Sequence, residues 1–180
     1  KYISIPCEEL KNQNNVFDVD VTKLIINVNN SGITGKQLGD ILRYKYNIEV
    51  EMDSLKYVLG ITTICDDYKE LERLAEALKE IDKSLEEKQN ENISVELLKN
   101  KRMYSIYETD LKEKNTVNLF DSKDCISGEF VFLYPPGIPL VVPGEVITEE
   151  LLEQIKVYLE ANMNISGLKD NSNKTIEVVK

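Results

Sequence analysis

The sequence predicts an α+β fold that is divided into two successive domains. Runs of β-branched residues alternate with amphipathic helical segments in both halves of the chain, and a charged stretch without apolar residues, residues 86–92, separates the halves. The chain has 180 residues, of which 42% are hydrophobic, enough for one medium domain or for two small domains with cores of their own. We expect a connector over residues 1–15, a small α+β domain over residues 16–88 and a second domain over residues 89–180. The charged stretch also fits a helix that continues into solvent.

The first domain is expected to begin with a strand and a helix. Residues 24–28 are rich in β-branched side chains, which favours a strand, and an Asn- and Gly-containing turn follows at residues 29–32. Thr34 and Gln37 match the T-x-x-Q capping box, so we predict a helix that begins at Thr34. Four residues should form its core face: Leu38, Ile41, Leu42 and Tyr46.

Two further strands and a second helix complete this domain in the prediction. Residues 48–53 alternate apolar and acidic side chains, which is the pattern of a strand with one buried face, and residues 57–64 predict another strand. Asp67 and Glu70 are spaced to cap the next helix. That helix carries one apolar stripe that we expect in the core: Leu71, Leu74, Ala75, Leu78, Ile81 and Leu85.

The second domain is expected to contain shorter elements. The sequence predicts a helix from Ser94, a strand over residues 103–107, a helix over residues 117–122 and a buried strand over residues 130–133.

A longer helix and a last strand should close this domain. Thr148 can cap the helix, and the acidic residues in its first turn suit the helix dipole. The inner face of this helix should consist of Leu151, Leu152, Ile155 and Leu159. A turn over residues 167–174 should then lead to a strand over residues 175–179.

Residues 134–145, Y-P-P-G-I-P-L-V-V-P-G-E, form the most distinctive stretch of the chain. Its four prolines fix φ near −65°, whereas Gly137 and Gly144 can adopt angles that other residues avoid. We therefore predict a rigid loop whose apolar residues pack against the domain. The loop should present the carboxylate of Glu145 just before the helix that begins at Thr148.

Charge and hydropathy exclude several classes of function. Asp and Glu number 32 against 22 Lys and Arg, a net charge of −10, which argues against a nucleic-acid partner because phosphate contacts need clustered cations. An acidic surface would attract cationic ligands, although such an excess is most often a solvated face. No apolar run approaches the roughly 20 residues that span a bilayer, so we expect no membrane partner. The N-terminus also lacks the pattern of a signal peptide.

Cysteine and histidine usage limits the chemistry further. Cys7, Cys65 and Cys125 contain no C-x-x-C pair, and the chain has no histidine. We therefore expect no metal site and no disulfide framework, a cytoplasmic location, and inert, buried thiols at Cys65 and Cys125. Without histidine, Ser-His-Asp and Cys-His catalysis are excluded within this chain.

Residues 134–148, Y-P-P-G-I-P-L-V-V-P-G-E-V-I-T, resemble the signature in the C-terminal part of bacterial ornithine/lysine/arginine decarboxylases. These are pyridoxal-phosphate enzymes with an aminotransferase-type fold. Weaker agreement is found at D-V-T-K-L-I-I (residues 20–26), N-I-E-V-E-M-D (47–53) and T-I-C-D-D (63–67). The resemblance implies a small aminotransferase-type α/β domain that closes over the cofactor cleft, followed by the Orn/Lys/Arg decarboxylase C-terminal domain.

For the complete protein, the resemblance implies decarboxylation of arginine, lysine or ornithine to a polyamine precursor. The family binds pyridoxal phosphate through a lysine in a Ser-x-His-Lys context, which a chain without histidine cannot contain. We therefore expect no catalytic and no cofactor-binding residue here, and no activity of this segment alone. The expected partners are the large pyridoxal-phosphate domain and further copies in a homodimer or larger homo-oligomer.

The resemblance also implies where substrate binds. It places a substrate-facing carboxylate at Glu145, where a distal ammonium or guanidinium would be held, and Tyr134, Pro136 and Gly137 at the substrate entrance. Two alternatives stay open: Glu145 serves the dipole of the following helix, and the other three residues only shape the loop. A different class of function is also compatible with these domains, namely a non-catalytic polyamine-binding or regulatory module.

Overall fold

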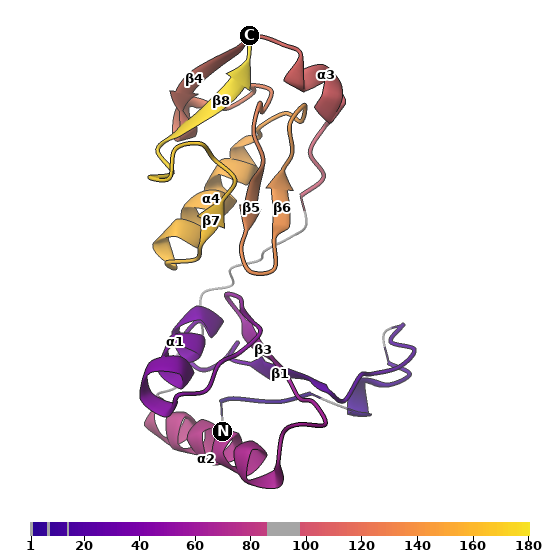
Figure 1. The fold of residues 1–180 in the computed structure, drawn as a ribbon, viewed down its shortest axis with the longest axis vertical. Helices are drawn as coiled ribbons and strands as arrows, with labels where there is room; N and C mark the ends of the chain where they lie inside the picture. The colour runs from indigo at the N-terminus through magenta and orange to yellow at the C-terminus, as the bar shows by residue number, and fades with distance from the viewer. Residues whose placement is uncertain (1, 7, 14, 86–97) are drawn as a thin grey trace. The chain divides into compact units, whose positions relative to one another are not determined.

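The computed structural model describes residues 2–6, 8–13, 15–85 and 98–180. The chain forms two compact units, Lys1–Ile93 and Ser94–Lys180, which we call unit 1 and unit 2 (Figure 1). Each unit has its own sheets and helices, which confirms the α+β prediction. The expected boundary at residues 88/89, the charged stretch and the expected helix from Ser94 lie outside the described residues.

Unit 1 is built on a three-stranded antiparallel sheet. Its strands are β1 (Lys23–Asn27), β2 (Met52–Asp53) and β3 (Tyr57–Ile61), in the order β1-β3-β2. Ile26 is directly opposite Val58 in the register, and both side chains are fully buried. The neighbouring Ile25 points to the other face and is 40% exposed, so one face of the sheet carries the core.

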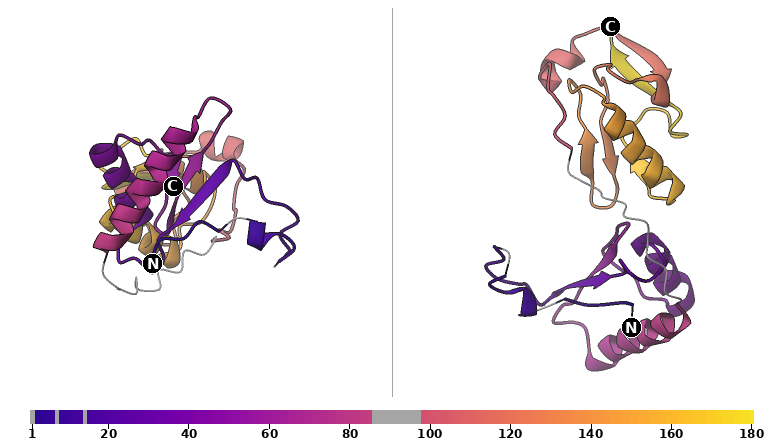
Figure 2. Two further views of the ribbon diagram at one scale, coloured as in Figure 1. Left: turned by 90° about the horizontal axis from the view of Figure 1, so that it is seen from below. Right: turned by 180° about the vertical axis from the view of Figure 1, so that it is seen from behind.

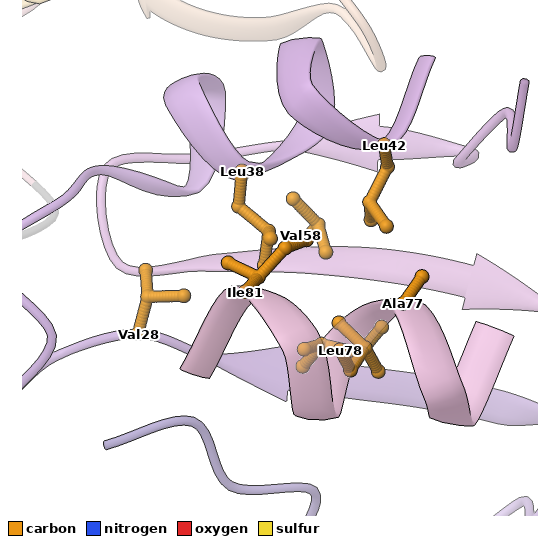
Figure 3. Packing of buried hydrophobic residues seen from close by; sticks show 8 residues of the cluster. Val28, Leu38, Leu42, Val58, Ala77, Leu78 and Ile81 are labelled. Atoms are coloured by element: carbon orange, nitrogen blue, oxygen red, sulfur yellow. The ribbon is translucent and has the colours of Figure 1, made fainter. Parts of the chain in front are cut away.

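Two helices, α1 (Gly35–Tyr46) and α2 (Tyr68–Ser84), cover this buried face. Figure 3 shows side chains from α1 and α2 meeting those of the sheet. The cluster consists of Ile26, Val28, Leu38, Leu42, Val58, Ala77, Leu78 and Ile81. Ile41 and Tyr46 pack against it and are partly buried, which confirms the predicted core face of α1.

Both helices begin where the capping residues predict. The Thr34 hydroxyl accepts a hydrogen bond from the Gln37 N–H at 3.1 Å, and the Gln37 side chain accepts one from the Thr34 N–H at 2.8 Å. Asp67 and Glu70 form the same reciprocal pair at α2. These bonds satisfy N–H groups that have no partner within the helix, so local sequence decides the helix starts.

The segment before β1 is part of unit 1 and bonds both α2 and β1. It contains a short 3-10 helix, η1 (Glu8–Leu10). The N–H groups of Tyr2 and Ile3 donate to the Asp82 carboxylate of α2 at 2.6 and 2.9 Å, and Ser4 pairs with Asn27 at the end of β1.

Three predictions for unit 1 were wrong in detail. Only Met52–Asp53 of the expected strand over residues 48–53 pairs with β3, although Ile48 and Val50 still pack on the core. β3 ends at Ile61 rather than at residue 64. In α2, Leu71 is 40% exposed and Ala75 is also exposed, whereas Ala77 is buried. The other residues of the predicted stripe contact the core: Leu74, Leu78, Ile81 and Leu85.

Unit 2 contains two small sheets. In the first, β4 (Lys114–Asn118) pairs antiparallel with β8 (Thr175–Val179) over the full length of both strands. In the second, β5 (Val131–Leu133) lies between β6 (Ile138–Val141) and β7 (Ile165–Ser166). The strand predicted over residues 175–179 is confirmed. The strand predicted over residues 130–133 forms as Val131–Leu133, but only Val131 in it is buried, and Phe130 is 41% exposed.

Three helical segments accompany these sheets, α3 (Ile106–Asp110), η2 (Leu119–Asp121) and α4 (Glu149–Glu160). Figure 2 shows α4 alongside the β5–β6 hairpin in the view from behind. Thr148 caps α4, as predicted. The buried residues of α4 are Leu151, Leu152, Ile155 and Tyr158; Leu159 is only partly buried.

Two short elements of unit 2 were predicted wrongly. Residues 103–107 are not a strand, because Ser105 and Glu108 form a capping box that begins α3 at Ile106. Residues 117–122 are not one helix, because β4 extends to Asn118 through its pairing with β8 before η2 begins. In both places a distant pairing or a local cap outweighed the apolar pattern.

The turn that leads into β8 is organised by Asp170. Its carboxylate accepts hydrogen bonds from the N–H and hydroxyl of Ser172, from the N–H of Lys174, and from the N–H and hydroxyl of Thr175. These donors, the Ser172 hydroxyl foremost, hold the pKa of Asp170 well below its ordinary value of 3.8.

We expect the stability of unit 2 to depend on the charge of Asp170. Because the folded-state pKa is depressed, the stabilisation is present above the unfolded value of 3.8 and is lost as pH falls through the folded value. Asp170→Asn should therefore lower the urea midpoint at pH 7, and the difference from the parent protein should shrink below pH 3.8. Glu153→Gln, which removes an exposed carboxylate from α4, is the matched control. A difference that stays constant as the solution is acidified would contradict this prediction.

Candidate functional site

The stretch over residues 134–145, predicted to be a rigid loop, consists of a hairpin turn, strand β6 and a second turn. Leu133 of β5 pairs with Ile138 of β6, and the Gly137 N–H closes the hairpin turn on the Leu133 carbonyl at 2.8 Å. Our loop prediction missed β6 because prolines are rare in strands. β6 is an edge strand, however, where Pro139 removes no central ladder hydrogen bond.

Three of the expected site residues lie together in the hairpin turn. Tyr134 is 56% exposed, and Pro136 and Gly137 are exposed beside it. Gly137 has a φ of +102° and open space where a Cβ would point. These residues therefore form an accessible tip.

Glu145 does not lie at this tip. Strand β6 separates it from the hairpin turn, and it follows a second turn in which the Glu145 N–H donates to the Val142 carbonyl at 3.1 Å. The structure of this chain thus places the four expected site residues in two locations at opposite ends of β6.

Gly144 fixes the backbone just before Glu145. It has a φ of +93°, and a Cβ there would lie 2.2 Å from the Tyr104 carbonyl oxygen. Its N–H donates to the Ser127 carbonyl at 2.8 Å, and its own carbonyl accepts from the Met103 N–H at 2.8 Å. Only glycine fits this conformation and this close backbone approach.

The Glu145 carboxylate is held from several sides. Its Oε2 accepts hydrogen bonds from the Asn100 Nδ2 at 3.3 Å and from the Val142 N–H at 3.2 Å. Its Oε1 lies 3.7 Å from the Arg102 guanidinium. The Glu145 side chain is 16% exposed, so it is a largely enclosed anion with a defined orientation.

Other groups than Glu145 cap the start of α4. The Thr148 hydroxyl accepts from the Leu151 N–H at the start of α4, and Glu149 and Glu150 provide the acidic first turn. Glu145 directs its Oε2 toward Asn100 and Val142 instead.

Sequence reasoning did not identify Asn100 and Arg102. Asn100 donates to the Leu140 carbonyl at 2.7 Å as well as to Glu145, and Arg102 pairs with Glu145 through backbone and side chain. Neither residue stands in a motif, and both are far from Glu145 along the chain. No sequence spacing predicts such a contact.

A pocket of about 180 Å³ lies in unit 1, between the sheet and the N-terminal half of α2. Leu24 and Gly60 of the sheet face Leu71 and Leu74 of α2 across it, and Arg73 is among its charged lining residues. Leu71 is exposed beside this opening, whereas Leu74 both lines the pocket and packs against the core.

The described residues offer little other chemistry. Cys65 is exposed, which contradicts the expectation of a buried thiol, and Cys125 is partly exposed. Within the described ranges, no group of three or more Cys, Asp or Glu side chains is arranged to hold a metal ion. None of the helices described here is both long and apolar enough to cross a bilayer.

Comparison with known proteins identifies the family. Residues 86–171 match the model of the Orn/Lys/Arg decarboxylase C-terminal domain. The chain carries the C-terminal domain of this decarboxylase family. The match includes the hairpin, Asn100, Arg102 and Glu145.

Relatives that align with most or all of the chain are also decarboxylases. The arginine decarboxylase of Bacillus subtilis (strain 168) is 37% identical over 167 residues, which cover 91% of this chain and 34% of the relative. The arginine decarboxylase of Bacillus anthracis is 31% identical over 183 residues, covering 100% of this chain and 37% of the relative. The chain therefore spans about a third of the length of these decarboxylases.

Solved structures show the same fold at low sequence identity. The constitutive lysine decarboxylase of E. coli superposes with a TM-score of 0.71 at 16% identity, covering 94% of this chain and 33% of that chain. The Francisella novicida lysine decarboxylase gives a TM-score of 0.70 at 18% identity, covering 94% and 32%. The decarboxylase-type fold thus extends over both units, beyond the region that the family model matches.

Proposed function

We propose that the complete protein is a pyridoxal-phosphate-dependent decarboxylase of arginine, lysine or ornithine that yields a polyamine precursor, and that Glu145 binds the distal cation of the substrate. The observation that carries the proposal is the fixed, largely enclosed carboxylate of Glu145 within a decarboxylase-family domain. A preoriented anion binds an ammonium or guanidinium with little loss of side-chain freedom. The names of the relatives support a basic amino acid as substrate.

In this proposal the other expected site residues have a separate role. Tyr134, Pro136 and Gly137 line the substrate entrance from the hairpin tip, at the opposite end of β6 from Glu145. Unit 1 serves as the small aminotransferase-type domain that closes over the cofactor. The complete protein acts in the cytoplasm as a homodimer or larger homo-oligomer, and this segment alone is inactive.

The residues of this chain do not fit a pyridoxal-phosphate anchor. Such an anchor requires an uncharged lysine amine, and the chain has no histidine to provide the family context. Lys36 is one of the more enclosed lysines, with a side chain 20% exposed. Burial alone would lower the pKa of Lys36, but the Asp40 carboxylate that it hydrogen-bonds and the nearby Asp53 raise it. We assign no cofactor step to this chain, and we propose that the large domain holds the cofactor.

The test is carbon dioxide release by the full-length protein with pyridoxal phosphate, offered arginine, lysine and ornithine separately. Glu145→Gln should raise KM for the accepted substrate about 10- to 100-fold, because hydrogen bonds to charged groups contribute about 1.5–3 kcal/mol. The fold should persist, since the amide keeps an acceptor oxygen for Asn100 and Val142.

Glu149→Gln is the matched control, because Glu149 is exposed and pairs with Lys123 at the surface. An unchanged KM in Glu145→Gln would refute the binding role. If the protein binds the cofactor and turns over none of the three amino acids, the decarboxylase proposal fails, and the polyamine-binding module becomes the function to test.

A further inference from the structure

The two oxygens of Glu145 have different environments. Oε2 accepts from Asn100 and from the Val142 N–H, at 3.3 and 3.2 Å. Both donors are fixed, since the Asn100 amide also bonds the Leu140 carbonyl at 2.7 Å and the other donor is backbone. Oε2 therefore anchors the carboxylate. Oε1 faces the guanidinium of Arg102 instead.

Arg102 is held by its backbone rather than by its side chain. Arg102 forms a β-bridge with Glu145, and the flanking peptide groups bond the same segment: the Lys101 carbonyl accepts from the Val146 N–H at 2.9 Å, and the Met103 N–H donates to Gly144 at 2.8 Å. The side chain itself is 61% exposed, and its guanidinium lies 3.7 Å from Oε1, beyond hydrogen-bond distance. The backbone thus keeps a loosely bound cation next to Glu145.

We propose that Arg102 is an internal cation that occupies the substrate's place on Glu145 and is displaced when substrate binds. This inference rests on the proposed function of Glu145. The substrate's distal ammonium or guanidinium and the Arg102 guanidinium have the same charge, so both cannot share Oε1 without repulsion. Since Asn100 and Val142 keep the carboxylate in place, the departure of Arg102 leaves the orientation of Glu145 unchanged.

The geometry predicts a common effect on all accepted substrates. Displacing Arg102 costs the free energy of an exposed ion pair, whatever cation replaces it. In Arg102→Gln, KM should therefore fall about two- to fivefold, by the same factor for each amino acid that is turned over, and kcat should stay unchanged. Arg102→Lys retains a cation and should keep KM near the parent value. Added salt should narrow the difference in KM between Arg102→Gln and the parent enzyme, because salt screens the exposed pair.

The experiment is steady-state kinetics of the full-length, pyridoxal-phosphate-loaded protein in a double-mutant cycle of Arg102→Gln and Glu145→Gln. The decrease in KM caused by Arg102→Gln should disappear in the Glu145→Gln background, because that background has no carboxylate for Arg102 and the substrate to compete for. Lys123→Gln is the matched control, since it removes another half-exposed cation from an ion pair of unit 2 and should leave KM unchanged. Circular dichroism checks that each variant is folded.

The outcomes separate the two proposals. If Glu145→Gln raises KM but Arg102→Gln leaves it unchanged or raises it, Arg102 is inert or positions Glu145, and this inference alone is refuted. If Arg102→Gln lowers KM equally in both backgrounds, Arg102 acts through general surface charge, which also refutes it. If Glu145→Gln leaves KM unchanged, the proposed function of Glu145 fails first.

Discussion

Replacing Gly144 by alanine is expected to destabilise unit 2 by about 3–5 kcal/mol, because a strained backbone angle and a steric overlap act together. At the φ of +93°, any side chain is disfavoured, and the new Cβ would lie 2.2 Å from the Tyr104 carbonyl oxygen and 2.7 Å from the Thr109 hydroxyl. The neighbour at 2.2 Å is backbone and cannot rotate away. Relieving the overlap would separate the segment of Arg102 from that of Glu145.

Gly137→Ala provides a matched comparison. Gly137 has a similar φ of +102°, but nothing lies within 4 Å of the position that a Cβ would take, so only the conformational penalty of about 1–2 kcal/mol remains. Native-state hydrogen exchange of peptides from β5, β6 and α4 measures both values within unit 2. Equal effects of the two substitutions would show that the close approach to Tyr104 costs nothing.

Leu38→Ala should destabilise unit 1 by about 2–5 kcal/mol, the range for truncating a fully buried leucine. Leu38 is 0% exposed and points from α1 into the cluster that α2 and the sheet complete (Figure 3). Its removal leaves a cavity between elements whose positions are fixed by the caps at Thr34 and Asp67.

Leu71→Ala removes the same atoms from α2 at a position that is 40% exposed beside the pocket. Its cost should stay below about 1 kcal/mol, because the side chain is already in contact with water and gives up little buried apolar surface. Urea unfolding, followed by hydrogen exchange of peptides from α1 and β3, measures the stability of unit 1 in the Leu38→Ala and Leu71→Ala variants. The burial assigned to Leu38 would be wrong if both variants lost the same stability.

Sequence reasoning worked where short-range chemistry decides the structure. The capping boxes at Thr34 and Asp67 and the cap at Thr148 set the starts of α1, α2 and α4 without help from distant residues. The β-branched runs likewise identified β1 and β3 in the sheet of unit 1, because one of its faces carries the core.

The prediction failed where long-range pairing decides. The sequence predicts a helix at the end of β4, because the partner strand β8 is distant along the chain. It predicts a loop at β6, because Pro139 is typical of loops and is tolerated in a strand only at a sheet edge. For the same reason the contacts of Glu145 with Asn100 and Arg102 were not foreseen. The resemblance predicts a role for Glu145, whereas the contacts of its carboxylate depend on the folded chain.

The pairing of β4 with β8 has a consequence for how the protein is made. The ribosome synthesises β4 long before it reaches Thr175–Val179, because β5, β6, α4 and β7 lie between them in the chain. Until β8 emerges, β4 has no partner strand on either edge, whereas the described helices and strands of unit 1 are synthesised before β4. A nascent chain arrested just before Thr175 would therefore contain a folded unit 1 and an unpaired β4. Chaperones and proteases would bind this unpaired strand, so unit 2 would not form a stable intermediate.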